Sequence, residues 1–145
     1  MTVVNLPGRR IVTASADETL SFGRQLAREL RPPLLVFLSG DLGAGKTTLA
    51  KGIISGLGAA REEEVTSPTF TLVHEFRGAA RVFHIDLYRI EGNADLATLG
   101  LEDLFASPAV VLVEWPEKWT LRTDWPLLRI HLAALADGTH SIEME

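Results

Sequence analysis

Residues 40–48 read GDLGAGKTT, and this stretch decides the fold of the chain. It fits the phosphate-loop pattern of glycine, four residues, glycine, lysine and serine or threonine, with Gly40, Gly45, Lys46 and Thr47 at the fixed places. The continuous apolar run just before it, at residues 34–38, is typical of a strand buried in a parallel sheet. Apolar residues then recur at helical spacing. The loop is therefore predicted to join a buried strand to the start of a helix.

The residue types of this loop suit the binding of nucleotide phosphates. Glycines let backbone N–H groups approach phosphate oxygens at a helix N-terminus, which carries partial positive charge. Lys46 is expected to reach the outer phosphates, and the Thr47 hydroxyl is expected to be a ligand of the Mg²⁺ that accompanies the nucleotide. The predicted nucleotide-binding residues of the loop are Gly40, Asp41, Leu42, Gly43, Ala44, Gly45, Lys46, Thr47 and Thr48.

The composition of the chain is ordinary for a soluble globular protein, with 46% hydrophobic and 23% charged residues. A length of 145 residues predicts one domain, residues 1–145. No signal peptide or membrane span stands out, and the absence of cysteine agrees with a cytoplasmic location. The four histidines lack zinc-ligand spacing. A net charge of −5 argues against broad nucleic-acid binding, so a partner is expected to hold most of any RNA.

Turn signals and periodicity predict an α/β fold, a single-domain P-loop NTPase with a central mixed parallel and antiparallel sheet flanked by helices. Short strands are expected at residues 2–4 and 9–13, followed by a helix that begins with a capping box, in which Glu18 reaches back to the Ser15 amide. The acidic run at residues 61–64 is interpreted as a solvated surface loop. Further strands are expected at residues 69–76 and 81–87, at 109–113, and at 127–133 and 140–144.

Two carboxylates are candidates for the chemistry, together with Lys46. Glu114 ends the second apolar strand, where the acid of a phosphate-loop enzyme usually holds a metal-bound water, so Thr47 and Glu114 are the predicted magnesium residues. Asp86 is expected to share one face of its strand with His84. Two interpretations of that face are open. It orients an attacking water or the metal's hydration shell, or it is only a solvent-facing edge of the sheet. Which acid positions the water stays open.

Two further segments have more than one interpretation. Ser67, Pro68 and Thr69 concentrate hydroxyl groups around a proline, and they form either a plain loop entering a strand or a switch that senses the terminal phosphate and magnesium. Trp115 follows the predicted metal acid directly. Its ring either packs against the nucleotide or forms part of a partner surface.

Several motifs together resemble the TsaE ATPases, the small bacterial proteins required for threonylcarbamoyladenosine formation on tRNA. The matching blocks are GDLGAGKTT at 40–48, SPTFTLV at 67–73, HIDLYR at 84–89, LGLE at 99–102 and VEWPE at 113–117. The resemblance implies an ATPase that uses ATP and Mg²⁺, binds the TsaB and TsaD proteins, and enables repeated rounds of modification at the adenosine next to the anticodon. TsaD would perform the transfer itself, and tRNA would be reached only through the partner complex.

Carried onto this chain, the resemblance also implies roles for individual residues. Lys46 contacts phosphates, Thr47 and Glu114 belong to the magnesium site, Asp86 supports catalysis, and Trp115 lies near the nucleotide. Thr69 falls in the switch-like segment. The segment after residue 119 matches the family pattern more loosely.

Two other functions remain open from the sequence. A small-molecule kinase would use Asp86 to accept a substrate hydroxyl proton and Arg89 to stabilise charge. A nucleotide-sensing binding module would act through its conformation with little catalysis. A GTPase is disfavoured, because the chain contains no Asn-Lys-x-Asp sequence for reading guanine.

Overall fold

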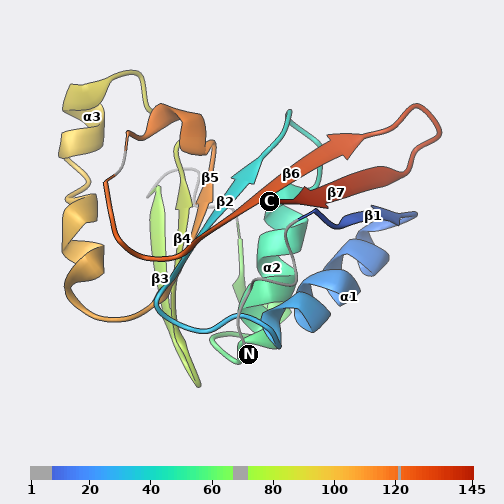
Figure 1. Ribbon diagram of the computed structural model, residues 1–145, viewed down its shortest axis with the longest axis horizontal. Coiled ribbons are helices and arrows are strands. Elements are labelled where there is room, and N and C mark those ends of the chain that lie inside the picture. Colours follow the sequence, from blue (N-terminus) through green and yellow to red (C-terminus); the bar gives the residue numbers. More distant parts are fainter. Residues whose placement is uncertain (1–7, 67–71, 121) are drawn as a thin grey trace.

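The computed structural model describes residues 8–66, 72–120 and 122–145, which contain one seven-stranded sheet of order β1-β7-β6-β2-β5-β4-β3 (Figure 1). The strands are β1 (Arg10–Thr13), β2 (Leu34–Ser39), β3 (Val73–Arg77), β4 (Arg81–Asp86), β5 (Val110–Glu114), β6 (Leu127–Ala134) and β7 (His140–Met144). The α-helices are α1 (Ala16–Ala27), α2 (Lys46–Gly56) and α3 (Asn93–Ala97), and the 3₁₀ helices are η2 (Glu62–Glu64), η3 (Leu101–Ala106) and η4 (Pro116–Lys118). No helix within the described residues is both long and apolar enough to cross a membrane.

The sheet is mixed, as predicted. Its centre is parallel, because β2 pairs with both β5 and β6, and β4 pairs with β5 in the same direction. The hairpins β3–β4 and β6–β7 and the pair β1–β7 are antiparallel. In the central register Leu38 lies opposite Glu114, and Glu114 lies opposite Asp86 on its other side. The C-terminal ends of β2, β5 and β4 therefore meet at one edge.

Helices cover both faces of the sheet, and the side chains of β2 alternate between them. Val36 and Leu38 face α1 and α2, where they pack with Ile53 in one buried cluster. Phe37 faces the other side, where α3 and η3 lie, and belongs to a second cluster that includes Leu101 (Figure 1). The sheet is thus a buried layer between two layers of helix, as the apolar runs of β2 and β5 predict.

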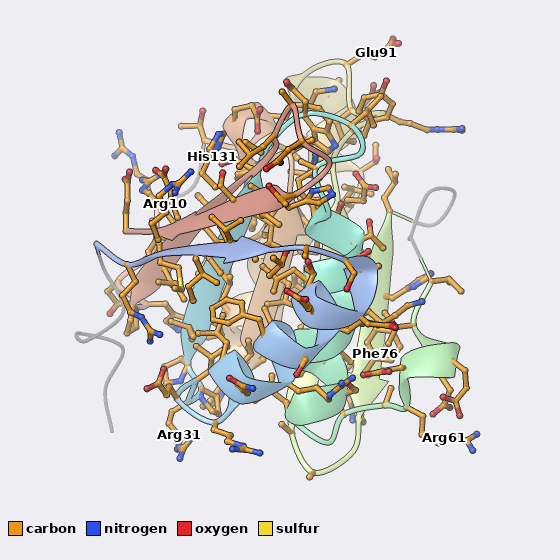
Figure 2. All side chains as sticks on the ribbon, turned by 90° about the vertical axis from the view of Figure 1, so that its right-hand side faces the viewer. Arg10, Arg31, Arg61, Phe76, Glu91 and His131 are labelled. Carbon is orange, nitrogen blue, oxygen red and sulfur yellow. The ribbon has the colours of Figure 1, made fainter. Side chains whose placement is uncertain are left out.

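Most local predictions hold, with three differences. The strand predicted at residues 69–76 does not include Leu72, which is a bend with a φ of 65°, and β3 begins at Val73. Ser15 Oγ caps α1 by accepting a hydrogen bond from the Glu18 amide at 3.1 Å, but the Glu18 carboxylate accepts from the Ala14 amide, 2.9 Å away, and not from that of Ser15. The acidic run lies at the surface as predicted, but Glu62–Glu64 form a 3₁₀ helix instead of a loop. The Glu64 carboxylate accepts from the Arg61 amide at 2.9 Å, and Glu62 pairs with Arg24 of α1. Arg61, 76% exposed, projects into solvent beside it (Figure 2). The strand predicted at residues 2–4 and the Ser67–Pro68–Thr69 segment lie outside the described residues.

Helices α1 and α2 touch through glycine. A Cβ added at Gly52 would lie 2.4 Å from the Leu20 backbone oxygen, and one at Gly23 would lie 2.9 Å from the Leu49 oxygen. These contacts involve backbone atoms, which cannot move aside as a flexible side chain can. The close approach matters for the site because α2 begins at the phosphate loop.

We expect Gly52→Ala to lower the free energy of unfolding by about 1–3 kcal/mol, as overpacking typically does. The clash outweighs the advantage of about 1 kcal/mol that alanine has over glycine within a helix. Urea denaturation measures the change. Gln25→Ala, on the exposed face of α1, is the matched control and should stay within about 0.5 kcal/mol of wild type. Equal stability of the Gly52 and Gln25 variants would show that the two helices are not in backbone contact.

Candidate functional site

The phosphate loop follows β2 and ends at the first turn of α2. Gly45 is the N-cap of α2 and has a φ of 104°, in the region that favours glycine. Gly40 allows a close approach, since a Cβ there would lie 2.2 Å from the Leu132 backbone oxygen. No side chain caps α2, and no acid lies in its first turn. The positive end of the helix dipole is therefore available to an anion.

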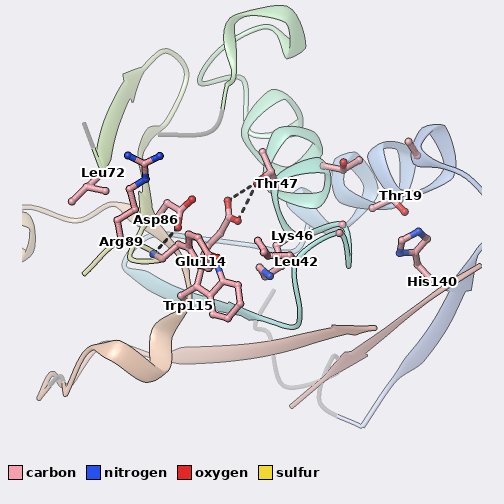
Figure 3. A pocket seen from close by; sticks show the side chains of 15 residues that line it. Thr19, Leu42, Lys46, Thr47, Leu72, Asp86, Arg89, Glu114, Trp115 and His140 are labelled. Carbon is pink, nitrogen blue, oxygen red and sulfur yellow. Dashed lines mark hydrogen bonds between the residues drawn. The ribbon is translucent and has the colours of Figure 1, made fainter. Parts of the chain in front are cut away.

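A cavity of about 540 Å³ opens beside this loop, which is within the usual range for small-molecule sites (Figure 3). Its lining comes from both ends of the chain and from its middle. The lining residues are Ala16, Thr19, Leu42, Gly43, Gly45, Lys46, Thr47, Thr48, Leu72, Asp86, Tyr88, Arg89, Glu114, Trp115 and His140. Of the predicted loop residues, Gly40 and Asp41 line a neighbouring cavity instead, and Ala44 is buried.

Lys46 lies deep in the site, with only 5% of the residue exposed. Its ammonium donates a hydrogen bond to the Asp41 carbonyl at 2.9 Å and another to the Gly40 carbonyl. The same Nζ lies 4.2 Å from the centre of the Trp115 ring, within range of a cation–π interaction. Burial lowers the pKa of Lys46, and the carboxylates of Glu114 and Asp86 partly oppose this shift. The ammonium is therefore held among groups that compensate its loss of water.

Glu114 accepts hydrogen bonds from two other residues of the site. Its carboxylate ends β5, is 3% exposed, and accepts hydrogen bonds from two directions. The Thr47 hydroxyl lies 3.1 and 3.0 Å from its two oxygens, Oε1 and Oε2, as the dashed lines in Figure 3 show. On the other side, His84 Nε2 lies 2.7 Å from Oε2. The two residues predicted to share a magnesium ion are therefore in direct contact.

Asp86 lies next to Glu114 on the neighbouring strand and is 8% exposed. Its Oδ1 accepts a hydrogen bond from the Tyr88 amide at 2.9 Å. The interpretation of the His84 and Asp86 face as a solvent-facing edge is wrong, because β4 lies between β3 and β5 and this face is buried. Arg89, proposed from the sequence for a kinase, lines the same cavity.

Several contacts of the site have no signal in the sequence. The contact of His84 with Glu114 joins residues 30 positions apart. At the far end of the cavity, Thr19 comes from α1 and His140 from β7, and the His140 ring Nδ1 lies 2.9 Å from the Ala44 carbonyl. Only the folded sheet brings these residues beside the phosphate loop.

Comparison with known proteins gives the family. The sequence model described as "Threonylcarbamoyl adenosine biosynthesis protein TsaE" matches residues 13–142. The chain belongs to the TsaE family. The predicted family is thereby confirmed, and with it the connection to threonylcarbamoyladenosine biosynthesis.

Individual relatives agree with this assignment, and each has the name "tRNA threonylcarbamoyladenosine biosynthesis protein TsaE". The protein of Treponema pallidum is 36% identical over 92% of this chain and 97% of its own length. The protein of Bacillus subtilis is 41% identical, and the alignment covers 71% of this chain and 63% of that protein. The protein of Streptomyces coelicolor is 48% identical, and the alignment covers 66% of this chain and 65% of that protein. The crystal structure of Bacillus subtilis YdiB superposes with a TM-score of 0.70 at 30% identity, covering 94% of this chain and 84% of that one. The predicted α/β P-loop fold is confirmed.

The segment after β4 is tied to η4 beside the cavity. Lys118 Nζ donates a hydrogen bond to the Ile90 carbonyl at 3.1 Å and another to the Tyr88 carbonyl. The Tyr88 ring in turn packs 5.1 Å from that of Trp115, centre to centre. Lys118 thus fixes the wall of the cavity that carries Tyr88.

We expect Lys118→Met to loosen this wall, since methionine keeps the aliphatic stem and loses both hydrogen bonds. A loss of about 1–2 kcal/mol of local stability corresponds to amide exchange about 5- to 30-fold faster at Tyr88. Hydrogen exchange read by NMR measures it. Lys51→Met, the same change on α2, is the control and should leave the Tyr88 amide as in wild type. An unchanged Tyr88 rate in the Lys118 variant would mean that other contacts hold the segment.

Proposed function

We propose that this protein is a Mg²⁺-dependent ATPase that supports threonylcarbamoyladenosine formation on tRNA by acting on a complex of the TsaB and TsaD proteins. The observation that carries the proposal is the hydrogen-bonded pair of Thr47 and Glu114 at the wall of the phosphate-loop cavity. Family membership supports the biosynthetic role. ATP hydrolysis and the partner complex rest on the site's chemistry and on the family resemblance.

The cavity has a shape that suits a nucleotide. Asp86 and Arg89 lie at one end, Lys46 in the middle, and Thr19 and His140 at the other end (Figure 3). The phosphates would lie over the first turn of α2, and the base would extend toward Thr19 and His140. On binding, Lys46 would exchange the Gly40 and Asp41 carbonyls for phosphate oxygens, which are stronger acceptors because they are charged.

The residues present also fit Mg²⁺, which usually takes one or two protein oxygens together with substrate phosphates. Thr47 offers a hydroxyl oxygen, and Glu114 an acceptor for the ion's hydration shell. When bound, the ion would neutralise negative charge on the phosphates. Glu114 already accepts hydrogen bonds from His84 and from Thr47, the expected Mg²⁺ ligand. We therefore assign Glu114 to the magnesium site, and we assign Asp86 to orienting the attacking water. The oxygen of this water would attack the terminal phosphorus as Asp86 accepts its proton, and ADP would leave with the electrons of the broken P–O bond.

Partner control is supported by the exposed apolar groups beside the cavity. Leu42 of the phosphate loop is 67% exposed and Tyr88 is 45% exposed. Large apolar side chains at the mouth of a site suit a protein surface that covers them and excludes water. In the complex, such a cover would be provided by TsaB or TsaD.

Lys46→Met tests nucleotide binding. Because burial disfavours the charged form of Lys46, we expect the melting temperature without ATP to stay within about 4 °C of wild type, the shift given by about 1 kcal/mol. ATP at 100 times its Kd should raise the wild-type melting temperature by about 5–10 °C and leave that of the variant unchanged. Lys51→Met, outside the cavity, should keep the full shift. An equal shift in both variants would mean that Lys46 does not bind the nucleotide.

Asp86→Asn tests hydrolysis. We expect ATP binding to stay within about 3-fold of wild type, and hydrolysis to fall at least about 100-fold, the usual scale for loss of a group that handles the proton of the nucleophile. In a reconstituted reaction with TsaB, TsaD, ATP and tRNA, repeated turnover should be lost. Asp124→Asn, an exposed acid away from the cavity, should behave as wild type.

Two outcomes would contradict the ATPase proposal. Full partner function in an Asp86→Asn variant that binds ATP without hydrolysing it would favour the nucleotide-sensing module. A phosphorylated metabolite in place of free phosphate would favour the small-molecule kinase, with Asp86 and Arg89 at the acceptor.

A further inference from the structure

His84 is a fully buried polar side chain on β4, with 0% of the residue exposed. It lies two residues before Asp86, so the two side chains are on the same face of the strand. It is not among the residues that line the phosphate-loop cavity. Among the residues that the structure describes, the ring makes one hydrogen bond to the site, from Nε2 to Glu114 Oε2 at 2.7 Å.

The chemistry of this contact fixes which nitrogen carries the proton. An ionised carboxylate only accepts hydrogen bonds, so Nε2 must be the donor. The other ring nitrogen, Nδ1, is buried and has no hydrogen-bond partner among the described residues. Among the described residues, the hydrogen bond that the His84 ring makes is therefore the one to Glu114.

Thr47 and His84 hold the carboxylate from opposite elements. The Thr47 hydroxyl, on α2, has one proton and shares it between the two carboxylate oxygens. His84, on β4, donates to Oε2 alone. Oε2 is therefore the oxygen more engaged by the protein, and Oε1 the one with more free acceptor capacity. Without His84, only the shared proton of the Thr47 hydroxyl would hold the carboxylate, and it does not distinguish the two oxygens.

We infer that His84 is a positioning residue, which orients the Glu114 carboxylate so that Oε1 is presented to the hydration shell of Mg²⁺. The inference rests on the proposed magnesium site and deepens it. Hydrogen bonds to metal-site carboxylates typically contribute 10- to 100-fold to metal affinity. His84 thereby acts through Glu114, and the binding of the nucleotide alone does not depend on it.

Two amide variants of His84 test this geometry, because they differ in reach and not in chemistry. The glutamine amide nitrogen is separated from Cβ by as many bonds as histidine Nε2, whereas that of asparagine corresponds to Nδ1. His84→Gln can therefore keep the hydrogen bond to Glu114, and His84→Asn cannot. The measured quantity is the gain in affinity for a fluorescent, non-hydrolysable ATP analogue when Mg²⁺ replaces EDTA.

We expect this gain to fall about 10- to 100-fold in His84→Asn and to stay within about 3-fold of wild type in His84→Gln, with the affinity in EDTA unchanged in both. Melting temperatures verify folding. His74→Asn, the same change at the position opposite His84 on β3, should keep the full gain. Equal gains in the Asn and Gln variants would overturn the inference and leave the magnesium site standing. No gain in wild type would overturn the magnesium site and the inference together.

A second measurement serves if His84→Asn folds poorly. His84→Leu is apolar and of similar size, and it also lacks the hydrogen bond to Glu114. If His84 acts through Glu114, this variant should lower the Mg²⁺-dependent gain in affinity as His84→Asn does, and adding it to Glu114→Ala should cost no further Mg²⁺-dependent affinity. A further loss of the same size as in the single variant would mean that His84 acts elsewhere, and would overturn the inference.

Discussion

The parallel pairing of β2 with β5 is the constraint on which the site depends. Parallel strands end at a common edge, so the phosphate loop leaving β2 meets the acid that ends β5, and the register places Leu38 opposite Glu114. The β4–β5 register then sets Asp86 beside Glu114. A slip of one residue would turn either acid to the opposite face of the sheet. The apolar residues of β5 prevent this slip, because both faces of that strand are buried and every alternate side chain has a place in one of two clusters.

The same edge concentrates polar groups that are costly to bury. Lys46, His84, Asp86 and Glu114 are each at least nine-tenths buried. Unpaired, each would destabilise the fold by several kcal/mol. The cost is offset by hydrogen bonds: the carboxylate of Glu114 receives donors from α2 and β4, and the ammonium of Lys46 donates to two carbonyls of its own loop. Asp86 accepts from the Tyr88 amide. Glu114 and His84 satisfy each other directly, so removing either one leaves the other without that hydrogen bond at a buried position.

Local patterns were sufficient to predict the parts of this architecture that depend on short stretches of chain. The phosphate loop, the runs that form β2 and β5, and the β6–β7 hairpin each have their signal within about ten residues. The acidic run at 61–64 lies at the surface as expected, but its 3₁₀ turn and the pairing of Glu62 with Arg24, 38 residues earlier, were not predicted. The contact of His84 with Glu114 and the place of His140 beside Ala44 depend on sheet order in the same way. Periodicity says which face a residue is on, but not what the neighbouring strand places against it.

Trp115 shows how the fold uses backbone strain at this edge. Its φ of 60° is in the left-handed region, which costs a residue with a Cβ about 1–2 kcal/mol. That conformation turns the chain sharply after Glu114, so that Pro116 starts η4 and the indole ring packs between Lys46 and Tyr88. The ring lines the phosphate-loop cavity and the neighbouring one that Asp41 also borders. Trp115 follows Glu114 directly, so its backbone conformation and the end of β5 are part of one continuous turn. The conformation of Trp115 and the position of the site's central carboxylate are therefore set together.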